Sequence, residues 1–261
     1  MKLNRLYLAC LSTMLMALAA CNKEEQFYKD QLYRINVNGY NGSTEQLDIK
    51  VGSMIFSGPI LPNTSFNLTD GYAFNSSENK LKLNVFEHGT GKLVLEKELK
   101  KEDGEANVNF LYMDGKIGPM PTKPAVEKDK ITLVYMFQPT ITNYTEPVDF
   151  VIGKYYLTPQ VFEELTRVKN VKPYEFSRPV SVGTFSTARQ EYNGVMTSVS
   201  FVVRIYKAGT NVPYVDGTSY TWHPLTSTAP KPGAGTAVSK LYIFSEAPEG
   251  GMMRFFTRLE L

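Results

Sequence analysis

Residues 81–99 read LKLNVFEHGTGKLVLEKEL, and this stretch decides the fold class. Apolar and polar residues alternate over residues 81–87, which is the period of a strand with one buried face. The connection at residues 88–91 contains Gly89 and Gly91, and a second apolar-rich run follows it. A short glycine-containing connection between two such runs predicts a β-hairpin.

Similar runs recur on both sides of this hairpin. Strands are expected over residues 32–38, 47–51, 107–113, 131–137, 148–153, 154–157, 181–185, 195–206, 241–244 and 253–259. Strands with one polar face, joined by turns rich in Gly, Asn, Asp and Pro, argue for an antiparallel sandwich. The sequence therefore predicts an all-β chain with two consecutive immunoglobulin-like, Greek-key β-sandwich domains. No sequence repeat relates the two halves.

The predicted domain boundary is the stretch 114–130, which reads DGKIGPMPTKPAVEKDK and holds three prolines. Such a stretch with little apolar periodicity is typical of a linker. It would separate an N-terminal β-sandwich at residues 31–113 from a C-terminal one at residues 131–261. The alternative is a long edge loop inside one larger sandwich.

One short helix is expected in the second domain. Thr158 is a suitable N-cap and Pro159 suits the first helical position. Apolar residues then recur on one helical face, at Val161, Phe162, Leu165 and Val168. This helix would cover an open sheet edge or one end of the sandwich.

The N-terminus has the features of a secretory signal. Lys2 and Arg5 precede a short apolar run over residues 6–18, which ends in Leu18, Ala19, Ala20 and Cys21. A cysteine directly after Leu-Ala-Ala resembles the lipobox of a bacterial lipoprotein. That resemblance implies removal of a signal peptide at residues 1–20 and lipidation of Cys21, whose acyl chains hold the protein on a membrane. An uncleaved membrane anchor is the alternative, but the apolar run falls short of the roughly 20 residues that span a bilayer.

Residues 21–30, CNKEEQFYKD, form a polar tether. Lys23, Glu24 and Glu25 resemble the charged export tract of surface lipoproteins of Bacteroidota. This resemblance implies an outer-membrane protein that is lipid-anchored and exposed on the cell surface. A periplasm-facing position is the alternative, because a charged tether also serves solubility.

Composition excludes several classes of function. Removing residues 1–20 takes away Lys2 and Arg5 and leaves 26 basic and 26 acidic residues, so no basic stripe for nucleic acid is expected. The only cysteines are Cys10, which is lost with the signal, and Cys21. Neither a disulfide nor a zinc–thiolate site is therefore expected.

No catalytic motif is present in the sequence. It lacks a Gly-x-Ser-x-Gly elbow, a His-Glu-x-x-His pair, a phosphate loop and a Gly-x-Gly-x-x-Gly fingerprint. The two histidines, His88 and His223, lie in different predicted domains. Acidic residues are plentiful, but no spacing singles out the carboxylate pair of a glycosidase. We predict a protein that is not an enzyme and that uses no cofactor and no metal.

Residues 211–224 concentrate aromatic and polar residues and include the only tryptophan. Rings that stack on apolar sugar faces, with polar groups beside them for hydroxyls, make a glycan-binding surface. The candidate ligand-binding residues are Tyr214, Asp216, Tyr220 and Trp222. The alternative is that Trp222 fills the core. The long loop at residues 224–238 that follows is either a lid or partner-binding loop, or a mobile surface loop.

These observations favour a binding or accessory lipoprotein, with a glycan or an outer-membrane protein such as a nutrient importer as its partner. A structural role is the second hypothesis, since two β-domains behind a lipid anchor also resemble fimbrillin-like pilin subunits. Such subunits are cleaved after an arginine, and Arg34 lies at the start of the first expected strand. A scaffold that binds an envelope protein through an exposed sheet edge is the third.

Overall fold

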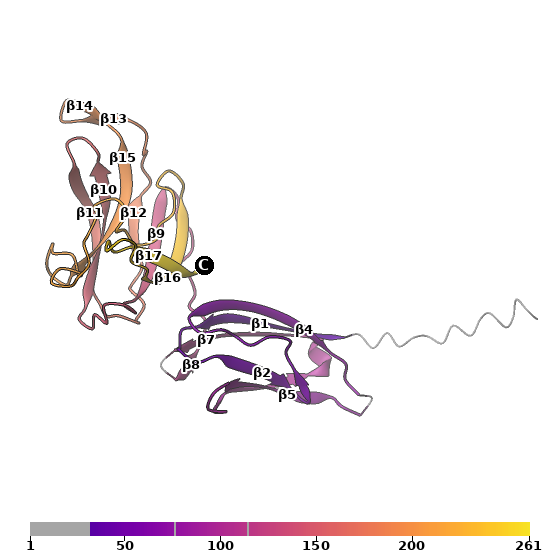
Figure 1. The fold of residues 1–261 in the computed structure, drawn as a ribbon. Coiled ribbons are helices and arrows are strands. Elements are labelled where there is room, and N and C mark those ends of the chain that lie inside the picture. The colour runs from indigo at the N-terminus through magenta and orange to yellow at the C-terminus, as the bar shows by residue number, and fades with distance from the viewer. Residues whose placement is uncertain (1–31, 76, 114) are drawn as a thin grey trace, which may run out of the picture.

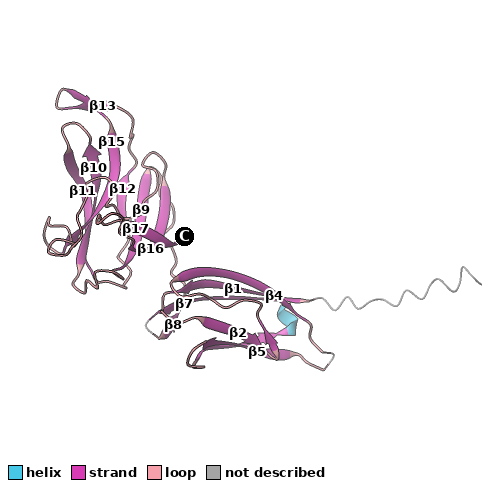
Figure 2. Cartoon of the chain, viewed as in Figure 1, coloured by secondary structure: helices cyan, strands magenta, loops and turns pink. Residues whose placement is uncertain are grey.

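The computed structural model describes residues 32–261, apart from Ser76 and Asp114. In this part of the chain the regular elements are β-strands, with one 3-10 turn at Lys101–Asp103 (Figure 2). The predicted all-β class is confirmed. The signal peptide 1–20, Cys21 and the tether 21–30 lie outside the described residues. No helix among the described residues has the length and hydropathy that crossing a membrane requires.

Residues 33–118 form two four-stranded sheets that face each other, here called the N-terminal sheet pair (Figure 1). The first sheet has the order β4-β1-β7-β8, with bounds Thr64–Tyr72, Tyr33–Asn41, Glu105–Met113 and Lys116–Gly118. The second has the order β3-β2-β5-β6, with bounds Met54–Ile55, Leu47–Val51, Lys80–Glu87 and Leu93–Lys100. The inward residues of the alternating runs make the core between the sheets, among them Ile35, Val37, Ile49, Leu83, Val85 and Val108.

Residues 130–260 form the C-terminal sheet pair (Figure 1). One sheet has the order β12-β9-β16-β17, with bounds Val180–Gly183, Lys130–Gln138, Val238–Glu246 and Phe255–Glu260. The other has the order β11-β10-β15, with bounds Val161–Val171, Val148–Tyr156 and Val199–Lys207, and a separate hairpin joins β13 (Gln190–Tyr192) to β14 (Val195–Thr197). Aromatic rings dominate the core between the sheets, including Tyr135, Phe137, Phe150, Phe201 and Phe244.

The two sheet pairs have the same strand order apart from β6, although their sequences show no repeat. In each pair the first strand lies between an antiparallel and a parallel neighbour: β1 lies between β4 and β7, and β9 lies between β12 and β16. The hairpin partners β8 and β17 complete these sheets. In the facing sheets, β3-β2-β5 corresponds to β11-β10-β15. The two sheet pairs therefore differ in sequence but share a topology, and each has its own buried core.

The C-terminal sheet pair has no strand equivalent to β6, so β15 would present a free edge. Residues 208–237 cover it instead, because Ala229 N donates to Val203 O (2.9 Å) and Tyr214 N donates to Ile205 O (3.2 Å). Tyr135 Oη also donates to Pro230 O (3.0 Å). The stretch 224–238 is thus packed on the sandwich, where the sequence suggested a lid or a mobile loop.

The helix predicted from Thr158 onward is wrong. Residues 161–171 form β11, which pairs with β10 along its length. Two register shifts each place one extra residue in β11, so its inward residues Leu165, Val168 and Val171 are spaced by three. A bulged strand with this spacing looks like one face of a helix. Pro159 follows a cis peptide bond in the turn before β11.

The expected linker is shorter than the sequence indicated. Residues 116–118 form β8 and extend the first sheet beyond residue 113, and residues 119–129 contain no strand. Residue 130 already belongs to β9. The division of the chain into two domains stays a prediction.

A third apolar cluster lies where the two sheet pairs meet. Tyr40 of β1 packs with Val134 and Met136 of β9 and with Leu241 and Ile243 of β16. The hydroxyl of Tyr40 is fully buried there and donates to Oε1 of Gln138 at 2.8 Å. The junction therefore has its own small core, which fixes the loops at the adjoining ends of both sheet pairs.

Candidate functional site

The structure places Tyr214, Tyr220 and Trp222 against the C-terminal core and leaves Asp216 exposed. Tyr214 is 1% exposed, and its hydroxyl donates to Glu246 Oε1 at 2.8 Å inside the sandwich. Asp216 is exposed in a turn, where its carbonyl oxygen accepts a hydrogen bond from Lys207 Nζ (2.9 Å). Tyr214 therefore supports the core, and its buried ring has no face for a ligand.

Trp222 closes one end of the C-terminal core. Its ring is partly buried, with centroids 6.4 Å from Tyr214 and 6.3 Å from Phe255. Tyr220 is also partly buried against the same core. The structure brings Trp222, Tyr214 and Phe255 together as packing partners. Sugar binding by Trp222 and Tyr220 stays a prediction.

The two histidines lie in different sheet pairs and serve local roles. His88 Nδ1 lies 2.8 Å from Asp48 Oδ2 on the surface of the N-terminal sheets. His223 Nδ1 accepts from the backbone N–H groups of Leu225 and Thr226, each at 3.3 Å. Across residues 32–261, with the two undescribed positions left aside, no group of three or more potential metal ligands occurs.

A cavity of about 320 Å³ lies where the loops of the two sheet pairs meet, and we call it the junction cleft. Loops at one end of the N-terminal sandwich supply most of its lining, and the C-terminal sheet pair supplies Thr140 and Tyr174. Binding sites commonly occur at such junctions and on loops held by a rigid scaffold. The lining residues are Gly42, Ser43, Thr44, Glu45, Asn63, Glu87, Tyr112, Gly115, Thr140 and Tyr174.

Asn41 holds the β1–β2 loop of the cleft in place. Its buried side chain donates through Nδ2 to the carbonyl oxygens of Glu45 (2.7 Å) and Leu61 (3.1 Å). Its Oδ1 accepts from Ser43 N at 3.1 Å and from Ser43 Oγ at 2.7 Å. Asparagine in a turn commonly bonds to backbone two residues onward. This loop is therefore ordered before any ligand binds.

Glu87 forms one wall of the cleft and is held as a carboxylate. Thr90 Oγ1 donates to Glu87 Oε2, and the hydroxyl of Tyr112 donates to Oε1. These hydrogen bonds, Thr90 first, lower the pKa of Glu87, and Lys92 at 3.6 Å adds to the effect. Burial, with the bond to Glu87, raises the pKa of Tyr112 to about 12, so the phenol stays protonated.

The opposite wall comes from two turns of the C-terminal sheet pair. Thr140 N donates to Gln138 O and Tyr174 N donates to Phe137 O, each at 2.9 Å. Tyr174 has a φ of 64° and its side chain remains 37% exposed. A non-glycine residue in the left-handed region is uncommon, and such residues cluster at functional sites. The turn presents an aromatic ring beside the hydroxyls and carboxylates of the cleft.

The chemistry of the cleft is that of a hydrogen-bonding site. Its lining combines hydroxyls, the amide of Asn63 and the carboxylates of Glu45 and Glu87, and it contains no Lys, Arg or His. None of these residues was singled out from the sequence. The available signal was the set of turn-forming stretches around Asn41, Asn63 and Gly115, which a sandwich gathers at one end.

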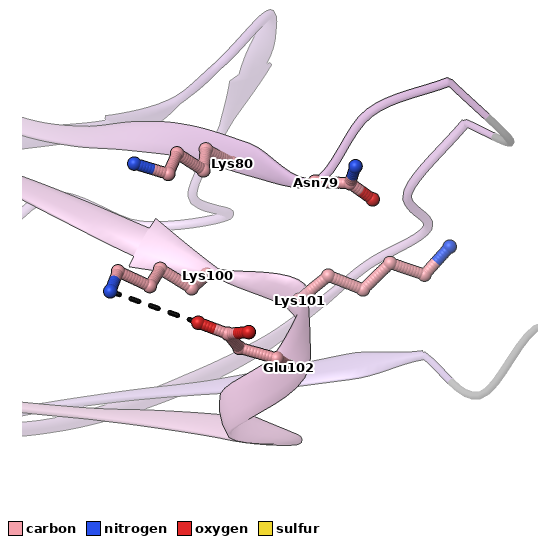
Figure 3. Close-up of a pocket in the computed structure, with 5 residues that line it drawn as sticks. All are labelled: Asn79, Lys80, Lys100, Lys101 and Glu102. Carbon is pink, nitrogen blue, oxygen red and sulfur yellow. Dashed lines mark ion pairs between the residues drawn. The ribbon is translucent and has the colours of Figure 1, made fainter.

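A larger cavity of about 470 Å³ lies beside the 3-10 turn (Figure 3). Lys80 and Lys100 point one way while Lys101 points the other. Glu102 lies 3.7 Å from Lys100, and Glu98 lies 2.9 Å from Lys80. Lys80 and Lys100 are already paired with acids, and Lys101 points away from them with its Nζ 5.8 Å from the ring centroid of Phe74, so the three lysines do not converge on one anion.

No family model and no curated protein matches the chain. Among solved structures, the family 26 carbohydrate-binding module CBMbc of Eubacterium rectale Amy13K, crystallised with maltoheptaose, aligns with a TM-score of 0.20 at 9% identity. That alignment covers 86% of this chain and 95% of the module. A leucine-rich repeat protein from Bacteroides thetaiotaomicron VPI-5482 aligns with a TM-score of 0.14 at 12% identity, over 70% of this chain and 25% of that chain. TM-scores this low do not establish a shared fold.

Proposed function

We propose that this protein is a non-enzymatic, lipid-anchored surface protein that binds a glycan in the junction cleft. The observation that carries the proposal is the cleft itself, whose loops are fixed by Asn41 and by the buried junction core. Its volume of about 320 Å³ lies at the lower end of the roughly 300–1,000 Å³ range of ligand sites. A space of this size suits one or two sugar rings.

The lining of the cleft suits sugars better than flat apolar molecules. A sugar ring needs donors and acceptors around its edge and an apolar surface against its C–H face. Asn63, Glu45 and Glu87 supply the polar groups, and Tyr174, a 37% exposed residue of the lining, supplies the stacking surface. Glu45 has no ion-pair partner among the described residues, whereas Glu87 is paired with Lys92, so the carboxylate of Glu45 favours a neutral glycan over an acidic one because like charges repel.

The state of Glu87 argues against a role as a general acid. A general acid must hold a proton near the working pH. Glu87 has a lowered pKa and accepts hydrogen bonds on both carboxylate oxygens, so it holds no proton to deliver. A ligand hydroxyl can still be oriented by Glu45 at the cleft wall.

The proposed lipid anchor and cell-surface location rest on the sequence of residues 18–25. Lipidation of Cys21 and the Lys23-Glu24-Glu25 tract would hold the protein on the outer leaflet of a Bacteroidota outer membrane, where an accessory protein could pass glycans to an importer. We expect Cys21→Ala to move the protein from the membrane fraction to the soluble fraction. Retention of that variant on membranes would exclude the lipid anchor.

We also propose that each sheet pair is one immunoglobulin-like, Greek-key domain. The support is that both pairs have two facing sheets, the same strand order and separate cores. Independent folding of residues 119–261 would test the division.

The pilin hypothesis receives less support from the position of Arg34. A cut after Arg34 would leave Ile35–Asn41 paired with both β4 and β7 in the middle of its sheet. No groove for a donated strand would open, because the core positions Ile35 and Val37 would stay filled.

The function is tested with a glycan array probed by the chain without its signal peptide and with Cys21→Ala. We expect saturable binding to a neutral glycan, weakened by Tyr174→Ala and by Glu45→Gln. Absence of binding to every arrayed glycan would overturn the proposal. Loss of binding in Trp222→Ala but not in the cleft variants would move the site to the 211–224 stretch.

A further inference from the structure

The outer face of the sheet β11-β10-β15 carries two arginines in one cross-strand row. Val151 of β10 pairs with Arg167 on one side and with Arg204 on the other. The neighbouring residues Phe150, Val203 and Ile205 belong to the core, so this row faces away from it. The two arginines share one surface but differ in what they bind.

Every nitrogen of the Arg167 guanidinium already donates a hydrogen bond. Its guanidinium donates to Asp149 Oδ2 at 3.2 Å and to Glu164 at 3.0 and 2.8 Å. It also donates to Thr210 O (2.8 Å) and to Asn211 Oδ1. Two carboxylates therefore neutralise this cation, and its donors tie β11 to the segment that follows β15.

Arg204 has one hydrogen-bond partner among the described residues, the hydroxyl of Tyr206, which accepts at 2.8 Å. Within the described chain no carboxylate lies at ion-pair distance from it, and its Nε is buried with no acceptor. The guanidinium carbon lies 3.9 Å from the ring centroid of Phe162 and 5.8 Å from that of Tyr155. An arginine stacked on aromatic rings is held in one orientation while its charge stays unpaired.

Gly153 creates the room for this arrangement. A Cβ at Gly153 would lie 2.7 Å from two ring carbons of Phe162 and 2.1 Å from the carbonyl oxygen of Glu163. With no side chain at that position, Phe162 lies across β10 and supports Arg204. The rings of Phe162 and Tyr155 therefore hold Arg204 in place without a ligand, because the missing side chain at Gly153 leaves room for Phe162.

We propose that Arg204 forms a second binding site, separate from the junction cleft, for the carboxylate of an acidic sugar residue. Planar guanidinium groups pair with carboxylates through two parallel hydrogen bonds, and charge-assisted bonds of this kind are among the strongest available. Arg204 supplies the one unpaired cation of the row, which matches a ligand with one carboxylate per residue. This inference does not rest on glycan binding in the cleft.

The neighbouring groups on β15 favour a sugar acid over an acidic peptide. Tyr206 is 6% exposed and accepts from Arg204, and its own hydroxyl proton is not used in that bond. Ser200 lies on the same face, since it pairs with Tyr155. Hydroxyls around one arginine suit a ring that bears hydroxyls and one carboxylate. Arg167 is already neutralised, so Arg204 can pair with one carboxylate of such a ligand.

The test is calorimetric titration of the Cys21→Ala chain with trigalacturonate, with its methyl ester and with hexaglutamate. We expect binding of trigalacturonate alone. Arg204→Gln and Arg204→Lys should each weaken it about tenfold or more, because neither side chain can form the two parallel bonds. Arg178→Gln, which removes the same charge from an exposed position, should bind as the parent does. Thermal unfolding checks that both Arg204 variants remain folded.

Three results would overturn the proposal: no binding of trigalacturonate, equal binding of its methyl ester, or unchanged binding by the Arg204 variants. Tighter binding of hexaglutamate would instead identify an acidic protein segment as the ligand. Glu45→Gln separates the two sites, because it alters the junction cleft and leaves Arg204 untouched. Weaker neutral-glycan binding in Glu45→Gln with trigalacturonate binding retained would show that the two sites are separate. Absence of neutral-glycan binding by the parent chain, with trigalacturonate bound, would contradict the cleft alone.

Discussion

The hydroxyl of Tyr40 donates a 2.8 Å hydrogen bond to Oε1 of Gln138, and this bond joins the two sheet pairs inside their buried junction. Burial raises the pKa of Tyr40 to about 12, which keeps the donor proton in place. Gln138 is fully buried, and its Nε2 has no partner among the described residues. Tyr40 is therefore the partner of the amide oxygen of Gln138.

Removing that hydroxyl should destabilise the protein. Tyr40→Phe keeps the ring and leaves the buried amide of Gln138 unpaired at both ends, which costs about 1–3 kcal/mol. Urea unfolding followed by circular dichroism measures the loss. Tyr220→Phe is the matched control, since no hydrogen bond of its hydroxyl occurs in the described structure. Equal stability of Tyr40→Phe and the parent would show that the bond contributes nothing.

Gly42 leaves room for three junction residues, Tyr40 and Met113 of the N-terminal sheet pair and Gln138 of the C-terminal one. A Cβ there would lie 2.7 Å from Met113 Cγ and 2.8 Å from Tyr40 Cε1. Gly42→Ala should therefore displace the junction and cost about 1–3 kcal/mol, as overpacking does. Gly58→Ala, where a Cβ meets nothing within 4 Å, should be close to neutral. A Gly42→Ala protein with parental stability and parental glycan affinity would contradict this role.

The lowered pKa of Glu87 predicts that the protein loses stability in acid. Its folded pKa lies below its ordinary value of 4.5, so the unfolded chain takes up the proton first as the pH falls. The stability it contributes is complete above about pH 4.5 and declines as the pH falls through the lower folded pKa. Urea midpoints between pH 3 and 7 should fall less steeply for Glu87→Gln than for the parent. The control is Glu102→Gln, at an exposed acid, whose urea midpoints should depend on pH as steeply as those of the parent. Identical slopes for Glu87→Gln and the parent would rule the contribution out.

Trp222 is expected to act through packing. Trp222→Ala would remove a partly buried ring from Tyr214 and Phe255, at a cost of about 2–3 kcal/mol. Because Trp222 is the only tryptophan, its fluorescence reports this end of the sandwich. A folded Trp222→Phe protein should keep parental affinity for a cleft-bound glycan. Weakened binding by that variant would indicate that the glycan contacts the 211–224 stretch.

Strand positions were predictable where alternation is unbroken. The expected strand 47–51 coincides with β2, because Leu47, Ile49 and Val51 all face the core. β4 was not predicted, since Asp70 and Gly71 interrupt its apolar positions. β11 was mistaken for a helix because its bulges space the inward residues by three. Bulges depend on the partner strand, which a single sequence does not reveal.

The junction cleft was beyond prediction for a related reason. Glu45 and Glu87 are far apart in sequence and meet only because β2 pairs with β5. Tyr174 then approaches from the other sheet pair, positioned by Phe137 O. The aromatic stretch 211–224 was visible in the sequence, yet the ring of Tyr214 is buried in the core.

The most direct test of the account is calorimetric titration of the strongest array glycan into the Cys21→Ala chain and its Tyr174 variants. We predict saturable binding of one glycan per chain, loss of about tenfold in affinity with Tyr174→Ala, and near-parental affinity with Tyr174→Phe, which keeps the ring. Parental affinity in a folded Tyr174→Ala protein would show that the glycan does not occupy the junction cleft.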